Sequence, residues 1–129
     1  VNRAITIRER LLHRDRRSDI SNDLARVYAN KAEFVEDTGD FGQAIELLDK
    51  AIRIREFLVV HDKRPELLGD LLVVRVTRAR VLAASGRKDA AETDAHEIMA
   101  LLNAEIEKTG RADLVRLREK VSEQLRELP

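Results

Sequence analysis

The sequence predicts an all-α fold in which antiparallel helix pairs stack side by side into a solenoid of about six helices. Apolar residues recur at helical spacing along the whole chain, and no stretch shows the strict alternation of a β-strand. The 129 residues include only five Gly and two Pro, too few for a protein built of many turns. The third observation is an internal repeat, which is typical of stacked helical units.

A repeat of 47 residues organises the chain. The segment AITIRERL, which begins at Ala4, recurs as AIRIREFL from Ala51. At this single offset, 14 of the 47 aligned positions are identical in the two copies, and Asp15 aligns with Asp62. A third copy survives weakly in three matched pairs, which are Arg64 and Arg111, Leu67 and Leu114, and Val74 and Val121.

Helix signals divide the first part of the chain into two helices. The first is already under way at Val1, which is not a Met, so we expect the chain to be a fragment of a longer protein. A linker is expected near residues 14–18, and a second helix over about 18–38 ends before Gly39, where a helix C-terminal glycine belongs. Its expected core positions are Leu24, Val27, Tyr28, Ala32 and Val35.

The remaining helices follow the same logic. The helix over 41–60 carries two apolar stripes, which indicates packing on two sides. After a linker at 61–65, Pro65 suits the first turn of a helix that ends at Gly86. A further helix over 88–109 ends at Gly110, and the last begins near residue 112. The expected units are therefore 1–17, 18–64, 65–110 and a terminal helix over 111–129, all in one domain.

The segment GDFGQAIELLDKAI resembles a tetratricopeptide repeat. The matching positions are Gly39, Asp40, Phe41, Ala44, Leu48 and Ala51, with Tyr28 and Ala32 at the family's large and small positions upstream. The resemblance implies a right-handed α-solenoid, and it is most specific over 25–55 and weak after about 109. The period of 47 is similar to the long-helix variety seen in kinesin light chains and many bacterial proteins. In the second unit, Lys88 and Ile98 depart from the pattern.

The resemblance implies a non-catalytic module that binds a peptide or protein segment in a concave groove. The first helix of each pair lines that groove in the family, and the matching positions here are Arg26, Asn30, Glu33, Asp37, Val73, Thr77 and Arg80. Asn30 is expected to clamp a peptide backbone, because its amide both donates and accepts hydrogen bonds. Glu33 and Arg80 occupy equivalent places in adjacent units and are expected to pair across the groove. Val73 and Val76 either lie sandwiched in the core or form an apolar strip for a ligand helix.

The alternative function is a structural module that oligomerises through its terminal helical faces. The last helix carries one apolar face and a polar outer side, which is typical of a capping helix. A coiled-coil or dimer seam on the same face is the other interpretation. The apolar residues of this face are Leu114, Leu117, Val121, Leu125 and Leu128.

Composition excludes several other classes. The 24 basic and 24 acidic residues cancel, although they alternate in blocks along the chain, so neither nucleic acid nor a membrane surface is an expected partner. Cys is absent, and no phosphate-binding loop or catalytic signature occurs. His96 with Glu92 is an i, i+4 pair that would need further ligands to hold a metal. We therefore expect a cytoplasmic protein without enzymatic activity, cofactor or metal.

Overall fold

The computed structural model describes residues 2–129, and the side chains of residues 2–5 and 7 lie outside the described part. Over this range the chain forms five α-helices, one short 3-10 turn and no strand. The elements are α1 (Asn2–Asp37), α2 (Phe41–Val60), η1 (Pro65–Leu67), α3 (Leu68–Ala84), α4 (Lys88–Thr109) and α5 (Ala112–Arg126). The all-α prediction is confirmed.

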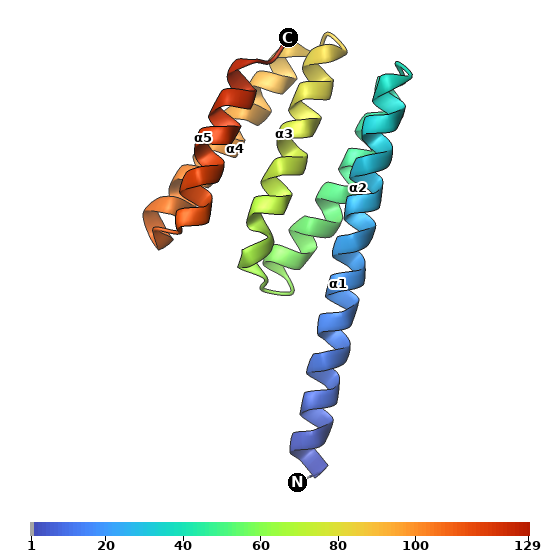
Figure 1. The fold of residues 1–129 in the computed structure, drawn as a ribbon, viewed down its shortest axis with the longest axis vertical. Coiled ribbons are helices and arrows are strands. Elements are labelled where there is room, and N and C mark those ends of the chain that lie inside the picture. Colours follow the sequence, from blue (N-terminus) through green and yellow to red (C-terminus); the bar gives the residue numbers. More distant parts are fainter. Residues whose placement is uncertain (1) are drawn as a thin grey trace.

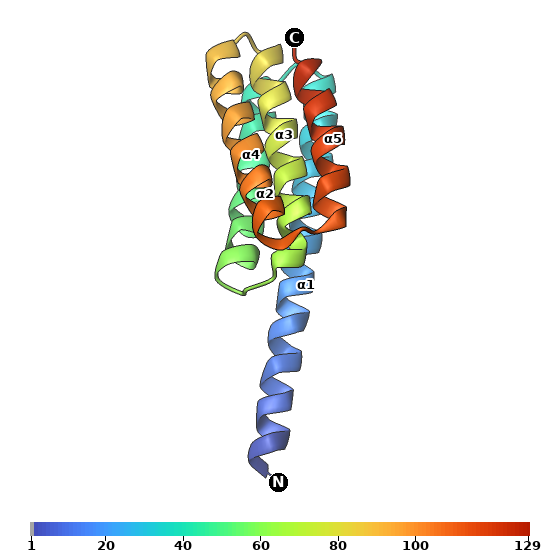
Figure 2. The ribbon, with the colours of Figure 1, turned by 90° about the vertical axis from the view of Figure 1, so that its left-hand side faces the viewer.

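Successive helices run antiparallel, and each packs on the next (Figure 1). Helix α2 packs on both α1 and α3, while α4 packs on both α3 and α5. Viewed from the side, α2 and α4 lie on one side of the molecule and α1 and α5 on the other, with α3 between the two pairs (Figure 2). Helix α3 also contacts α5 directly.

Helix α1 is one continuous helix of 36 residues, so the expected break near residues 14–18 is absent. The repeat gives the reason, because Ser18 stands where the next unit has Pro65. Proline lacks a backbone donor and disfavours helical geometry in the residue before it. The chain accordingly turns at residues 61–64, with Lys63 at a φ of 53°. Ser18 imposes no such restriction, so the prediction of about six helices is wrong and the described residues form five.

The N-terminal part of α1 projects past the end of α2 (Figure 1). We call residues 2–17 the arm. All side chains from residue 8 to residue 17 are exposed, including the apolar Leu11 and Leu12. None of the side chains described over residues 8–17 of the arm is therefore buried against another helix.

The first of two main core clusters joins α1, α2 and α3. Small residues allow the helices to approach closely, and Ala25, Ala44 and Ala51 are fully buried at the crossing. Tyr28 packs at the edge of this N-terminal core, with the ammonium of Lys50 5.6 Å from its ring centroid. The other buried members are Ala32, Val35, Leu47, Leu48, Val74 and Val81.

The second cluster, the C-terminal core, joins α3, α4 and α5. Its buried residues are Leu72, Val76, Ile98, Leu102, Leu114 and Val121. Helix α3 thus contributes to both cores, as its nearly all-round apolar sequence indicated. Two expected core residues of α1 behave differently, since Leu24 and Val27 are exposed. Both lie on the side of α1 that no helix of the described chain covers.

A buried arginine links three helices. Arg55 of α2 donates one hydrogen bond to Oδ1 of Asn22 in α1 and another to the carbonyl of Asp70 in α3, each 3.2 Å long. Burial lowers the pKa of its guanidinium, and the nearby Asp70 carboxylate partly opposes that shift.

Two further arginines repeat one contact along the stack, 47 residues apart. Arg64 binds Asp19 of α1 at 2.9 Å, and Arg111 binds the carbonyl of Pro65 at 2.8 Å. Each also pairs with the acid two residues ahead, which raises the pKa of both guanidinium groups and lowers that of Glu66 and Asp113. The ends of neighbouring units are therefore joined by equivalent arginines, one through a carboxylate and the other through a backbone carbonyl.

Candidate binding groove

The groove residues expected on α1 all reach the solvent. Arg26, Asn30, Glu33 and Asp37 are spaced so that they share one side of the helix, and each is exposed. Arg26 pairs with its neighbour Asp23, at 3.3 Å. Within the described part of the chain, the amide of Asn30 makes no side-chain hydrogen bond. That amide is therefore accessible to a ligand backbone.

An ion pair bridges α1 and α3 beside these residues. Both Nη atoms of Arg80 bind the two carboxylate oxygens of Glu36, and the longer contact is 2.9 Å. The prediction that Arg80 pairs with Glu33 is therefore wrong in its acidic partner. Glu36 lies close to one helical turn further along α1, where the carboxylate is largely shielded while Arg80 stays exposed. Glu33 remains exposed.

A pocket of about 350 Å³ lies between α3 and α5. Three of the expected groove residues, Val73, Thr77 and Arg80, line it together. Val76 and Ala84 complete the α3 side, and Gln124, Glu127 and Pro129 form the other side. The structure thus brings together the α3 half of the expected site, whereas Arg26, Asn30, Glu33 and Asp37 lie apart from this pocket on α1.

The pocket combines an apolar floor with charged edges. Val76 is buried in the C-terminal core, as the sandwiched interpretation expects, while Val73 is 44% exposed. The hydroxyl of Thr77 donates to the carbonyl of Val73 at 3.1 Å. Arg80 and Glu127 supply one charge of each sign. An apolar side chain flanked by polar or charged groups fits this lining.

Sequence reasoning missed the three residues from the end of the chain. Their position depends on the angle at which α5 packs against α3, and helical periodicity does not determine that angle. The apolar face of α5 does indicate which side turns inward, and it leaves Gln124 and Glu127 on the outer side.

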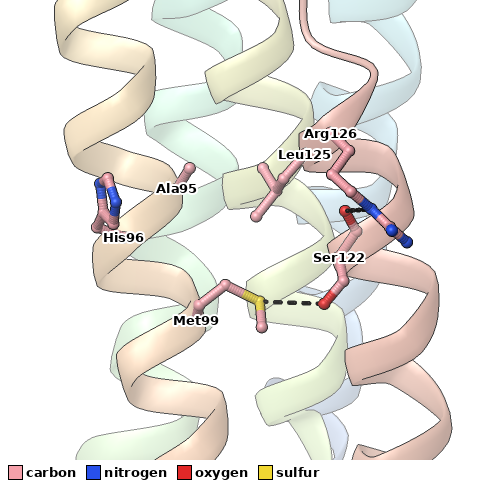
Figure 3. Close-up of a pocket in the computed structure, with 6 residues that line it drawn as sticks. All are labelled: Ala95, His96, Met99, Ser122, Leu125 and Arg126. Carbon is pink, nitrogen blue, oxygen red and sulfur yellow. Dashed lines mark hydrogen bonds between the residues drawn. The ribbon is translucent and has the colours of Figure 1, made fainter.

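A second hollow of about 510 Å³ lies between α4 and α5 (Figure 3). It is lined by Ala95, His96, Met99, Ser122, Leu125 and Arg126. Asp49, Ile52 and Arg78 occupy the equivalent places in the preceding unit, where His96, Met99 and Leu125 stand here. In the preceding unit Arg78 binds both Asp49 and Asp94, so α4 packs beside that surface.

His96 is the histidine that lines this hollow. His96 Nδ1 lies 2.9 Å from the carbonyl oxygen of Glu92, and the Ser122 hydroxyl contacts Met99 Sδ at 3.8 Å (Figure 3). Among the residues that the structure describes, no three His, Cys, Asp or Glu side chains gather closely enough to hold a metal ion.

Comparisons with protein-family models, with curated proteins and with solved structures find no match to this chain. None of the helices in the described part of the chain has the length and apolar character needed to cross a lipid bilayer.

Proposed function

We propose that the chain is a non-catalytic binding module that holds a peptide or protein segment along α1 and α3. The helix stack that carries this surface is, in the same proposal, a right-handed solenoid of the tetratricopeptide type. The 47-residue repeat, the antiparallel packing and the alanines at the α1–α2 crossing support that assignment.

The observation that carries the proposal is the pocket between α3 and α5. Val73, Thr77 and Arg80 line this pocket, whose volume is about 350 Å³. They are the equivalents of Arg26, Asn30 and Glu33 on α1. An apolar anchor of the ligand would contact Val73, and a carboxylate would bind Arg80 beside Glu36. Asn30 would contact the backbone further along the ligand.

A peptide selection tests this function. A displayed library of random peptides is selected on the immobilised chain, and the recovered peptides are measured by calorimetry against the chain and its variants. Val73→Asp places an unpaired charge on the floor of the pocket, and we expect it to weaken binding by about tenfold or more. Asn30→Ala is expected to weaken binding by a smaller factor.

The matched control changes a charge on the opposite side of the fold. Arg53 is exposed on α2, so Arg53→Glu should leave peptide affinity unchanged, whereas Arg80→Glu should reduce it. Peptides that bind equally well to Val73→Asp, Asn30→Ala and Arg80→Glu would show that the ligand lies elsewhere.

The alternative of assembly through terminal faces is not equally supported at the two ends. In α5, the apolar residues pack inward against α3 and α4, which removes the basis for a coiled-coil seam there. The positions equivalent to Leu72 and Val76 of α3 are Glu119 and Glu123, which are exposed. The opposite end, at α1, has a different character.

A further inference from the structure

Helix α1 carries an uncovered row of large apolar side chains, which we call the α1 stripe. Its apolar members are Ile20, Leu24, Val27 and Phe34, with exposed fractions of 68%, 44%, 58% and 71%. The side of α1 that faces α2 contains Ala25 and Ala32 instead. A contiguous apolar row of this kind marks an interaction surface.

The repeat shows how the same positions behave when a helix covers them. The equivalents of the stripe in η1 and α3 are Leu67, Leu71, Val74 and Val81, and their exposed fractions lie between 1% and 7%. Val74 and Val81 pack against α2 in the N-terminal core. One apolar pattern is thus buried under a helix in the second unit and open in the first.

A positively charged residue within the stripe indicates what else the covering helix should carry. Lys31 lies within the stripe and is the equivalent of Arg78. Arg78 donates from Nε to Oδ1 of Asp49 on the covering helix α2, at 2.7 Å. A helix that covers the α1 stripe should accordingly present apolar side chains together with a carboxylate opposite Lys31.

The α1 stripe of a second copy, running antiparallel to the first, meets that description. Ile20, Leu24, Val27, Lys31 and Phe34 are separated by four, three, four and three residues, which is the spacing of a coiled-coil seam. In an antiparallel pair of identical helices with Val27 on the two-fold axis, Ile20 lies opposite Phe34 of the second copy. Lys31 lies opposite Asp23 of the second copy, which supplies the carboxylate, and Leu24 lies opposite its Asn30.

We propose that two copies of this chain associate through their α1 stripes as an antiparallel, two-fold symmetric dimer. Each side chain of the stripe meets its counterpart by the same symmetry, so the interface closes on itself and forms no filament. The stripe spans 15 residues, with a rise of about 21 Å from the first to the last, so the interface is small and a Kd of roughly 10–100 μM is expected. None of the residues that line the pocket between α3 and α5 belongs to the α1 stripe.

Sedimentation equilibrium of the whole chain between about 5 and 500 μM measures the association. We expect a monomer–dimer equilibrium for the unaltered chain. Val27→Glu places two like charges on the two-fold axis and should give a monomer throughout this range. Val27 is exposed, so the circular dichroism spectrum should not change. Val60→Glu is the matched control, because Val60 is 76% exposed at the end of α2 and should leave the dimer intact.

A charge exchange tests the register of the pair. Asp23→Lys and Lys31→Asp should each weaken the dimer severalfold, and the double exchange should restore its Kd to within about threefold of the unaltered chain. A monomer at the highest concentration would overturn the proposal. A dimer that survives Val27→Glu would do the same, as would a double exchange that does not recover.

Discussion

Ser18 shows how a single polar residue joins elements that are far apart in the sequence. It is 2% exposed, and its hydroxyl donates to Oδ2 of Asp62 at 2.8 Å, connecting α1 to the turn after α2. This hydrogen bond is the largest cause of the lowered pKa of Asp62, and the neighbouring His61 adds to the effect. The contact therefore links the stability of the fold to pH.

Replacing Ser18 by Ala tests that link. The change removes the donor and should lower the free energy of unfolding by about 1 kcal/mol at neutral pH. Because the pKa of Asp62 is depressed in the folded state, this stability is complete above the ordinary carboxyl range and is lost as the pH falls through the folded value. Urea unfolding of both proteins at pH 7 and near pH 2 should show the difference shrinking in acid. Ser122→Ala, whose hydroxyl contacts only Met99 Sδ, is a control without a carboxylate partner. A difference that is equal at both pH values would contradict the assignment.

Side-chain partners could be predicted only within a turn of a helix. The alternation of charge indicated that Arg80 meets an acid of α1, and the structure pairs it with Glu36 rather than Glu33. Periodicity defines a helix face to about 100°, so the final choice depends on how α1 and α3 are rotated against each other. For the same reason Leu24 and Val27 were expected in the core although they face outward. Their apolar character was clear from the sequence, but the absence of a covering helix was not.

At the scale of elements, proline and glycine residues decide where helices end. Pro65 and its equivalent Ser18 explain why the chain turns once and continues once at matched positions. The ends of α1, α3 and α4 could be predicted because the residue after a helix often has a positive φ, which glycine adopts without strain. Gly39, Gly86 and Gly110 all have a positive φ. The element boundaries could thus be read from the sequence wherever such a residue is present.

Gly86 gives an element-scale prediction. Its φ is 90°, and a Cβ added there would meet no atom within 4 Å. Gly86→Ala should therefore lower the free energy of unfolding by about 1 kcal/mol through backbone strain alone, without a steric clash. Gly42→Ala is the matched control, since Gly42 is helical within α2 and should gain slightly from the added methyl group. Thermal unfolding of the two variants should move the midpoint in opposite directions, and equal losses would show that strain is not the cause.

At the scale of the whole molecule, stability is distributed unevenly. Two cores share α3, whereas the arm projects past the end of α2 and its described side chains over residues 8–17 are all exposed (Figure 1). Such a gradient is typical of helix stacks, in which each element is stabilised by its neighbours.

Hydrogen exchange should resolve this gradient. Amides of residues 4–13 should exchange many times faster than those of residues 25–35, because opening the arm breaks no core contact. The equivalent residues 51–60 of α2 are an internal control, since six of their ten positions are identical to those of the arm and they are packed between α1 and α3. Their amides should be protected. Equal protection of the arm and α2 would indicate that the arm is covered in solution.

The position of Tyr28 makes its fluorescence a probe of one part of the molecule. It is the only tyrosine, tryptophan is absent, and its ring lies at the edge of the N-terminal core beside Lys50. Tyrosine fluorescence therefore monitors the N-terminal core formed by α1, α2 and α3, whereas far-ultraviolet circular dichroism averages over every helix. Recorded together during one unfolding experiment, the two signals compare half of the molecule with the whole, without a label or an introduced residue.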